Sequence, residues 1–239
     1  MTSWAEAVSH RLSGGRIEQC DAGHAKHQTV TVDTVQGPMR VFAADRYQDI
    51  HGYCTGDDQV SRSLAASGVW EPHIYAGLAT LGVLDDAQLG EHVIDFGSHV
   101  GWYTRLAVNA GFTVVAVDGE PEHLSLTVRN AGTDVITARG WLDCDSKFVT
   151  VPDDDSTVRL VKADVEGAER HAVRTIEPLL DAGLVDHLLL EISPVFNDTY
   201  HVLCTELVWR GFRAWRFDPL REWDWRLDFP QTEILFSRS

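Results

Sequence analysis

The second half of the chain alternates short hydrophobic runs with longer stretches of helical composition. Residues 92–96 (HVIDF) and 112–118 (FTVVAVD) are nearly continuous hydrophobic runs. The stretches that follow them, 101–110 and 121–132, suit helices, and the second has proline at its start and glycine near its end. Such an alternation is typical of a parallel sheet that helices cover on both faces.

The alternation continues to the C-terminus, with one change in the tail. Hydrophobic runs at 134–138, 157–164 and 186–192 predict three more strands, and the last two are followed by helical stretches. Residues 213–217 and 232–238 predict two final strands, but the loop between them is too short for a crossover helix. The last strand should therefore run antiparallel to its neighbours in an α/β fold.

The first 90 residues follow a different pattern. Residues 29–43 show β-branched alternation on both sides of a Gln-Gly pair, which predicts a hairpin. Residues 44–90 are helix-like, with apolar positions spaced for one helical face. We therefore expect one compact domain in two parts, a hairpin and helical cap over residues 1–90 and a sheet-based core over residues 91–239.

Charge and composition narrow the class of protein. The 36 acidic residues outnumber the 20 lysines and arginines, so the formal net charge is −16. Such a surface repels phosphate backbones, which makes nucleic acid an unfavourable partner. No apolar run approaches the roughly 20 residues of a membrane helix. The first residues lack the pattern of a signal peptide, so we expect a cytoplasmic protein with no membrane partner.

The stretch VIDFGSHVGWYT, residues 93–104, follows a predicted strand with two glycines, Gly97 and Gly101. A glycine-rich turn between a parallel strand and its helix lets a nucleotide-like cofactor approach bare backbone at a helix N-terminus. A dinucleotide site requires G-x-G-x-x-G, whereas here Asp95 precedes glycines spaced as G-x-x-x-G. Because an acid repels pyrophosphate and suits a cation, the turn favours S-adenosylmethionine (SAM) over NAD. The Ser98 backbone is expected to border this cofactor.

A second acid, Asp118, ends the next predicted strand. A carboxylate at this place can accept hydrogen bonds from both ribose hydroxyls of the cofactor. The alternative interpretation is that Asp118 caps the following helix. The loop after the third strand, near Trp141 to Ser146, is expected to lie at the ribose and adenine as well.

These residues resemble the FkbM-like methyltransferases, a family within the class I SAM-dependent superfamily. Members of that family carry V-I-D-x-G-A-N-x-G-x-Y-T/S, V-A-F-E-P-x-P, an asparagine, K-I-D-V-E-G-A-E and a glutamate that closes an apolar strand. The corresponding stretches of this chain are VIDFGSHVGWYT, VAVDGEP, Asn130, VKADVEGAE (161–169) and Glu191. The chain departs from the family where Ser98-His99 replaces Ala-Asn and Asp118-Gly119 replaces Glu-Pro.

The resemblance implies a Rossmann-like class I methyltransferase fold, with a seven-stranded sheet whose last strand is antiparallel. It also implies O-methylation of a hydroxyl on a small molecule, a sugar or a natural product. Within the matching motifs, Thr104 and Gly119 are assigned to the cofactor site. Glu71 stands where the family also has an acid, and we expect it to reach the methionine end of the cofactor or the methyl acceptor. The alternative interpretation is that Glu71 is a solvent-exposed residue at the start of a helix.

The catalytic candidates follow the strand at 157–164, at the edge where open α/β sheets bind ligands. Lys162, Asp164 and Glu166 alternate along the chain, so they are expected to point to the same side. Asp164 and Glu166 would orient and deprotonate the methyl acceptor, with Lys162 as their counter-charge. The alternative is that Glu166 and Glu169 only stabilise the N-terminus of the following helix through its dipole. His99, in the glycine turn, is a further candidate proton acceptor.

Three alternatives remain at this point. Glu191 could join the acids near residue 164 in a divalent metal site, although no His-x-His or D-x-D-x-D spacing favours it. A nucleic-acid methyltransferase would share the cofactor half, but ADVEG stands where an Asn/Asp-Pro-Pro-aromatic element would be expected. A non-catalytic SAM-binding module is the third alternative. The pattern makes no prediction about oligomeric state.

Overall fold

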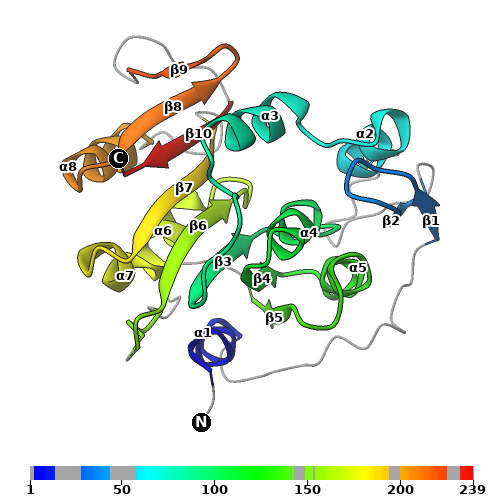
Figure 1. The fold of residues 1–239 in the computed structure, drawn as a ribbon, viewed down its shortest axis with the longest axis horizontal. Coiled ribbons are helices and arrows are strands. Elements are labelled where there is room, and N and C mark those ends of the chain that lie inside the picture. The colour runs from blue at the N-terminus through cyan, green and yellow to red at the C-terminus, as the bar shows by residue number, and fades with distance from the viewer. Residues whose placement is uncertain are drawn as a thin grey trace.

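The computed structural model describes the chain in eight segments, which are residues 3–13, 28–43, 58–140, 142, 149–152, 154–193, 200–224 and 232–238. Within these segments, helices cover both faces of a central sheet, and a two-stranded hairpin lies beside it (Figure 1). None of the helices described combines the length and the apolar character that crossing a bilayer requires.

The central sheet confirms the predicted α/β fold. Its strands are β3 (Glu91–Phe96), β4 (Thr113–Asp118), β5 (Ile136–Arg139), β6 (Thr157–Ala163), β7 (Val185–Ile192), β8 (Arg213–Phe217), β9 (Leu220–Glu222) and β10 (Thr232–Ser237). They lie in the order β5-β4-β3-β6-β7-β10-β8-β9. Strands β3 to β7 pair in parallel, whereas β10 runs antiparallel to both β7 and β8, as the tail predicts. The short β9 adds an eighth strand at the edge.

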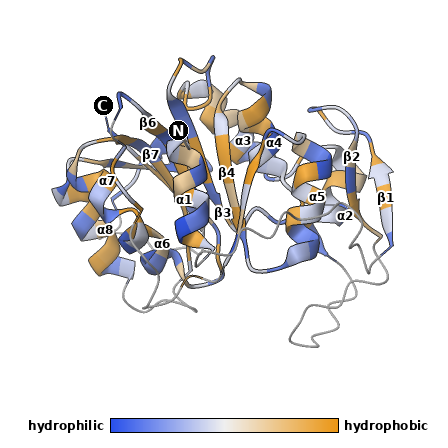
Figure 2. Ribbon diagram, turned by 90° about the horizontal axis from the view of Figure 1, so that it is seen from below, coloured by the Kyte–Doolittle hydropathy of each residue, from blue (hydrophilic) through white to orange (hydrophobic). Residues whose placement is uncertain are grey.

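Hydrophobic side chains alternate between the two faces of the sheet because successive residues of a strand point in opposite directions. In β3, Val93 belongs to the hydrophobic cluster on one face and Ile94 to the cluster on the other, and both are buried. Figure 2 shows these hydrophobic strands between helices that carry many hydrophilic residues. Continuous apolar runs in the sequence therefore correspond to strands buried on both faces.

Helices pack on each face of the sheet. One cluster includes α1 (Trp4–Leu12), α6 (Glu169–Thr175), α7 (Glu177–Asp181) and α8 (Tyr200–Trp209). The other includes α2 (Gln59–Ser67), α3 (Pro72–Thr80), α4 (Trp102–Asn109) and α5 (Pro121–Ala131). The sequence pattern did not predict α1, whose Ala5 and Val8 are fully buried and which lies against β4 and β5.

The predicted hairpin is present as β1 (Thr29–Val32) and β2 (Met39–Phe42), which pair antiparallel. Asn130 on α5 connects β2 to the turn after β3. Its amide donates hydrogen bonds to the carbonyls of Arg40 (2.8 Å) and Val100 (2.7 Å), and its oxygen accepts one from the Arg40 N–H (2.6 Å). This asparagine, one of the family-like residues, thus holds the N-terminal hairpin beside the glycine turn.

The order of the strands places a crevice between β3 and β6. From β3 the chain builds outward to β4 and β5 on one side, and from β6 it builds outward to β7 on the other. At such a switch point the loops after neighbouring strands diverge, and open α/β sheets bind their ligands there.

Candidate active site

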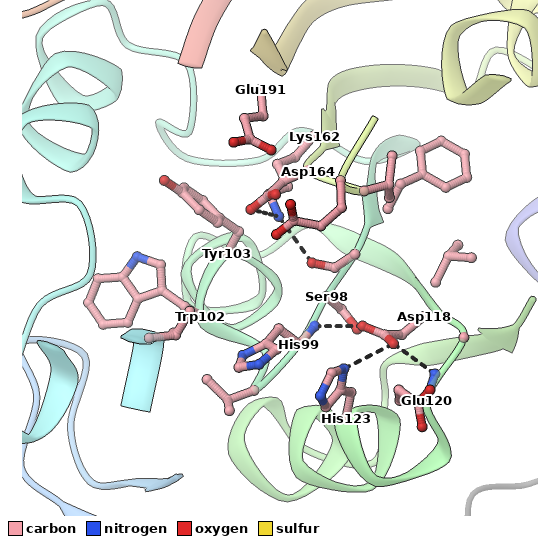
Figure 3. A pocket seen from close by; sticks show the side chains of 18 of the residues that line it. Ser98, His99, Trp102, Tyr103, Asp118, Glu120, His123, Lys162, Asp164 and Glu191 are labelled. Atoms are coloured by element: carbon pink, nitrogen blue, oxygen red, sulfur yellow. Dashed lines mark hydrogen bonds and ion pairs between the residues drawn. The ribbon is translucent and has the colours of Figure 1, made fainter. Parts of the chain in front are cut away.

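A cavity of about 770 Å³ lies at the carboxyl ends of β3, β4, β6 and β7, a volume typical of small-molecule sites. Figure 3 shows side chains from several of these strand ends directed into it. Nine of the predicted site residues line the cavity, namely Glu71, Gly97, Ser98, His99, Asp118, Gly119, Lys162, Asp164 and Glu166. Loops far apart in the sequence therefore meet where the switch point predicts.

Three other predicted site residues, Asp95, Gly101 and Thr104, are not among the residues that line this cavity. Asp95 is buried at the end of β3, where its Oδ2 accepts a hydrogen bond from the Thr104 hydroxyl (2.6 Å). Gly101 packs against α5. Trp141 lies outside the described residues, so its predicted role at the adenine stays a prediction.

The two glycines of the turn are required by the packing of the chain itself. A Cβ on Gly97 would lie 1.9 Å from the carbonyl oxygen of Asp164, and one on Gly101 would lie 2.8 Å from the Cα of Thr127. Both glycines also have positive φ, 78° and 81°. The packing of the chain therefore requires glycine at both positions, and close approach by a cofactor stays a prediction.

Backbone N–H groups of the turn are already bonded within the protein. Those of Gly97 and Ser98 donate to the carbonyl of Val117 (2.8 and 3.2 Å). The His99 N–H donates to Asp118 Oδ2 (2.9 Å). These donors do not form a cradle for a pyrophosphate, whereas acidic side chains surround the turn. The chemistry of this part of the cavity suits a cationic cofactor such as SAM better than a dinucleotide.

Asp118 is held rigidly at the end of β4. Its Oδ1 accepts the N–H of Glu120 (2.9 Å) and lies 3.1 Å from His123 Nδ1. Burial raises the pKa of Asp118, but the positive charge of His123 and the backbone N–H bonds outweigh it, so the pKa lies below its ordinary value. Asp118 is therefore ionised at neutral pH and lines the cavity as a hydrogen-bond acceptor.

His99 and His123 lie together, and their pKa values are shifted in opposite directions. Their ring centroids are 4.3 Å apart. Burial lowers the pKa of His99 to about 4, and the neighbouring His123 adds to this shift. Burial also disfavours the charged form of His123, but Asp118 raises its pKa overall. His99 is thus a neutral imidazole, 3.3 Å from Asp58 at the N-terminus of α2, and a weak base.

Lys162 is buried and lines the cavity. Its Nζ donates to the Gly97 carbonyl (3.0 Å) and lies 3.3 Å from Asp164 Oδ2 and 3.9 Å from Asp95 Oδ1. Burial disfavours the charged ammonium, yet these carboxylates raise the pKa of Lys162. The expected pairing of Lys162 with Asp164 is present. The hydrogen bond to the Gly97 carbonyl joins strand β6 to the turn after β3.

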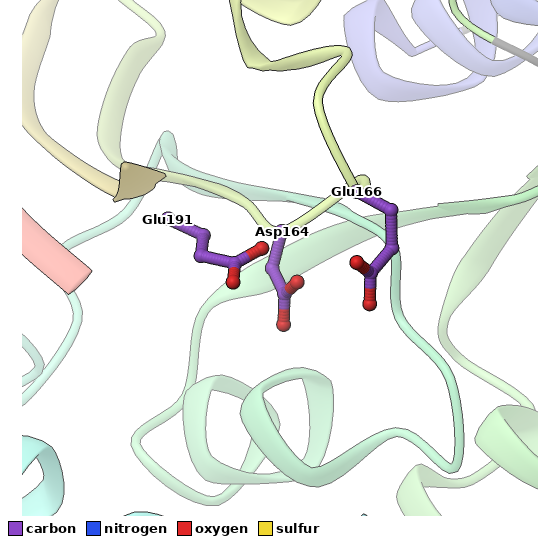
Figure 4. Close-up of side chains that lie close together, drawn as sticks. All are labelled: Asp164, Glu166 and Glu191. Carbon is purple, nitrogen blue, oxygen red and sulfur yellow. The ribbon is translucent and has the colours of Figure 1, made fainter. Parts of the chain in front are cut away.

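Asp164, Glu166 and Glu191 converge at the carboxyl ends of β6 and β7 (Figure 4). One oxygen from each carboxyl group lies within 4.8 Å of the others, a spacing at which one cation could bridge them. Burial, followed by the charge of Asp164, raises the pKa of Glu166. Glu169, in contrast, accepts the N–H groups of Val165 (3.2 Å) and Gly167 (3.1 Å), so it stabilises the loop.

A second pair of acids, Glu71 and Glu233, lies beside this group, since Glu233 is paired with Glu191 across the ladder of β7 and β10. Glu71 precedes α3, and its Oε2 accepts a hydrogen bond from the Tyr103 hydroxyl (2.5 Å). Glu71 is also hydrogen-bonded to Glu233 of β10. Burial raises the pKa of Glu71 to about 9, and the charge of Glu233 contributes to the shift. Glu71 is therefore protonated at neutral pH.

Backbone strain is concentrated at this cavity. Among the described residues, positive φ outside glycine occurs at Glu71 (46°), His99 (50°) and Glu166 (51°), and all three line the cavity. Such conformations cost on the order of 1–3 kcal/mol each and commonly occur at functional sites.

Sequence reasoning missed four cavity residues with carboxyl or imidazole side chains, Asp58, His123, Glu120 and Glu233. A helix-capping pattern marks Asp58, which accepts the Ser61 N–H (2.8 Å). Strand pairing would have placed Glu233, because it is directly opposite Glu191 in the antiparallel ladder. Only the folded turn brings His123 to Asp118, so no sequence pattern identifies that pair.

Comparison with known proteins supports the fold and leaves the family open. No family model matches the chain, and no curated protein does. A TehB-like SAM-dependent methyltransferase from Corynebacterium glutamicum is 16% identical, with a TM-score of 0.50 over 74% of this chain and 94% of that one. The chain therefore has the fold of the class I SAM-dependent methyltransferases.

Two further solved structures are similar at lower TM-scores. Magnesium protoporphyrin IX methyltransferase from Synechocystis with bound SAM is 17% identical (TM-score 0.44, 76% of this chain and 85% of that one). A proposed RNA methyltransferase from Pyrococcus horikoshii is 13% identical (TM-score 0.43, 82% and 92%). The likeness to FkbM-like enzymes rests on sequence motifs alone.

Proposed function

We propose that this protein is a cytoplasmic SAM-dependent methyltransferase that methylates a hydroxyl group of a small molecule. The observation that carries the proposal is the cavity at the switch point of a methyltransferase fold, where an ionised Asp118 and the acids after β6 line opposite parts of one space. The FkbM-like motifs support O-methylation as the reaction.

The cofactor half of the proposed site is the part between the glycine turn and β4. Asp118 would accept the ribose hydroxyls, because its Oδ2 accepts one backbone N–H and has capacity for another donor. Gly97, Ser98 and Gly119 border the same space. When bound, SAM supplies a sulfonium methyl group, and transfer forms the C–O bond, breaks the C–S bond and leaves S-adenosylhomocysteine (SAH).

In the acceptor half, Asp164 and Glu166 would hold the hydroxyl and take its proton. The raised pKa of Glu166 brings this carboxyl closer to the range that suits a general base near neutral pH. Lys162 would hold Asp164 in place through its 3.3 Å contact. Positioning of the reactants is expected to contribute most, since effective molarities of about 10⁵–10⁸ M are available from alignment alone.

The test is calorimetric titration of the protein with SAM, SAH and NAD, followed by incubation of the SAM complex with candidate hydroxyl compounds and mass spectrometry. We expect SAM and SAH to bind, NAD not to bind at millimolar concentration, and a suitable compound to gain one methyl group. Absence of SAM and SAH binding at millimolar concentration would contradict the proposal. Binding without transfer to any compound would instead support a non-catalytic module.

A chelator separates the two possible roles of the acids. With EDTA present, we expect methyl transfer to continue, because Lys162 already supplies a positive charge to Asp164. Loss of transfer with EDTA and recovery with Mg²⁺ would show that Asp164, Glu166 and Glu191 act through a metal ion.

A further inference from the structure

The carboxyl pair of Glu71 and Glu233 is the feature of the cavity that the methyl-transfer roles leave unused. The two residues come from the start of α3 and from β10, and both line the cavity. They share a hydrogen bond, and Glu71 also receives one from the Tyr103 hydroxyl (2.5 Å). Two ionised carboxylates have no donor to share, so one member of the pair must carry a proton.

The charges around this pair favour a cationic ligand. Besides Glu71 and Glu233, the acids Asp164 and Glu166 line the same side of the cavity. Among the described lining residues, Lys162 is the one lysine or arginine, and its ammonium is 3.3 Å from Asp164 and 3.0 Å from the Gly97 carbonyl. An anionic ligand would meet net negative charge here, whereas an ammonium would meet carboxyl groups able to ionise.

Aromatic side chains form the wall next to the pair. Trp70, Trp102 and Tyr103 line the cavity. Figure 3 shows Trp102 and Tyr103 on the side away from Asp118 and Glu120. Trp102 is only 2% exposed, and its indole N–H has no hydrogen-bond partner among the described residues. Aromatic faces attract cations and pack against flat apolar groups, and the indole N–H requires a hydrogen-bond acceptor.

We propose that the methyl acceptor is an amine-bearing aromatic molecule, whose ammonium binds between Glu71 and Glu233 while its hydroxyl faces Asp164 and Glu166. The aromatic body would pack against Trp102 and Tyr103. This inference rests on the proposed function, because it assigns the chemical class of the molecule that the methyltransferase acts on.

Three probes of similar shape and different charge test the inference on the protein saturated with SAH. Tyramine is a cation, tyrosol is neutral, and 4-hydroxyphenylacetate is an anion. Calorimetric titration should show tyramine binding at least about tenfold more tightly than tyrosol, which is a difference of about 1.4 kcal/mol. The anion should bind more weakly than both. Equal affinities, tighter binding of the anion, or no binding of tyramine at 10 mM would overturn the inference.

Charge-neutralising variants locate the ammonium. Glu233→Gln should reduce the preference for tyramine over tyrosol by about tenfold or more while SAH affinity stays within a few fold. Glu206→Gln, on α8 and outside the cavity, makes the same change in net charge and should leave the preference intact. An unchanged preference in Glu233→Gln, with the melting temperature of the wild type, would contradict the placement.

Proton release gives a second, independent readout. Burial together with Glu233 raises the pKa of Glu71 to about 9, while Tyr103 and Lys162 face it and lower the pKa. A bound ammonium favours the ionised form, so the pKa falls and a proton leaves at pH 7.5. Heats of tyramine binding in phosphate and in Tris should therefore report release of up to about one proton, and Glu71→Gln should abolish it.

The same titrations separate failure of the inference from failure of the proposed function. If SAH alone releases the proton and Glu71→Gln weakens SAH binding, the pair belongs to the cofactor site. That result overturns the inference and leaves the methyltransferase proposal standing. If SAH does not bind at all, the proposed function fails first.

Discussion

The two halves of the cavity are built in different ways. Around the turn after β3, backbone N–H groups are bonded within the protein, and Asp118 is bonded to two of these groups and to His123. On the opposite side, acids are gathered at the ends of β6 and β10 with raised pKa values at Glu71 and Glu166. In the proposed function, the first half would bind the cofactor and the second would supply the groups for acid–base chemistry.

In the proposed function, this contrast would let one cavity both bind the cofactor and carry out the reaction. A preorganised half loses little conformational freedom when its ligand binds. In the other half, crowded carboxyl groups have shifted pKa values, which is the property that acid–base chemistry requires. Lys162 links the halves, since it contacts both the Gly97 carbonyl and Asp164.

The largest expected effect comes from the acceptor half. In Asp164→Asn the carboxylate is lost while its size is kept, so turnover should fall by at least about 10²-fold, the lower range for a lost general base. SAH affinity should stay within a few fold, because Asp164 lies away from Asp118. Single-turnover kinetics and SAH titration of the same preparation measure both quantities. Normal turnover in this variant would show that Asp164 is not the general base and would assign that role to Glu166 or Glu191.

The next effect concerns the junction of the two halves. Gly97→Ala places a Cβ against the Asp164 carbonyl at a φ of 78°, and should lower the free energy of unfolding by at least about 3 kcal/mol. Gly211→Ala is the matched control, because Gly211 also has positive φ (91°) but nothing lies within 4 Å of its Cβ position. Urea denaturation should show a loss of about 1–2 kcal/mol there. Equal losses would mean that packing at Gly97 contributes nothing.

A smaller effect is expected from pH. The folded-state pKa of Glu71, about 9, lies above its unfolded value, so folding favours the protonated form. The Glu71 carboxyl contributes to the free energy of unfolding in full below its unfolded pKa, and this contribution is lost as the pH rises towards 9. Between pH 6 and 8.5 the wild type should lose stability relative to Glu71→Gln, by less than about 1.4 kcal/mol per pH unit, the limit for one proton. Parallel urea titration curves at these pH values would contradict the burial of Glu71 as an acid.

The smallest effect is expected at His99. Because burial lowers its pKa to about 4, the imidazole is a weak base, and His99→Asn should keep turnover within about tenfold of the wild type. The backbone N–H to Asp118 remains, so SAH affinity should not change. A loss of turnover near 10²-fold with SAH binding intact would restore His99 as a proton acceptor.

Local sequence patterns predicted most of the fold, because each strand or helix is determined largely by residues close together in the sequence. Apolar runs located β3 and β4, and the short tail predicted the antiparallel β10. Helix α1 was not predicted, although Ser3 and Glu6 form a capping box that marks its start in the sequence.

The site was predicted less completely for a physical reason. Residues next to strand ends, such as Asp118 and Asp164, were placed correctly at the cavity because topology fixes strand ends. Asp95 was expected at the cofactor, but its bond to Thr104 keeps it outside the cavity lining. Glu233 and His123 reach the cavity through tertiary pairing, which a linear pattern does not contain.

The most direct test of the two-halves account is a comparison of SAH affinity in Asp118→Ala and Asp164→Asn by titration calorimetry. The account predicts that Asp118→Ala weakens SAH binding by about 30- to 100-fold, the equivalent of 2–3 kcal/mol. Asp164→Asn should bind SAH within a few fold of the wild type. Loss of SAH binding in Asp164→Asn with unchanged affinity in Asp118→Ala would contradict the account.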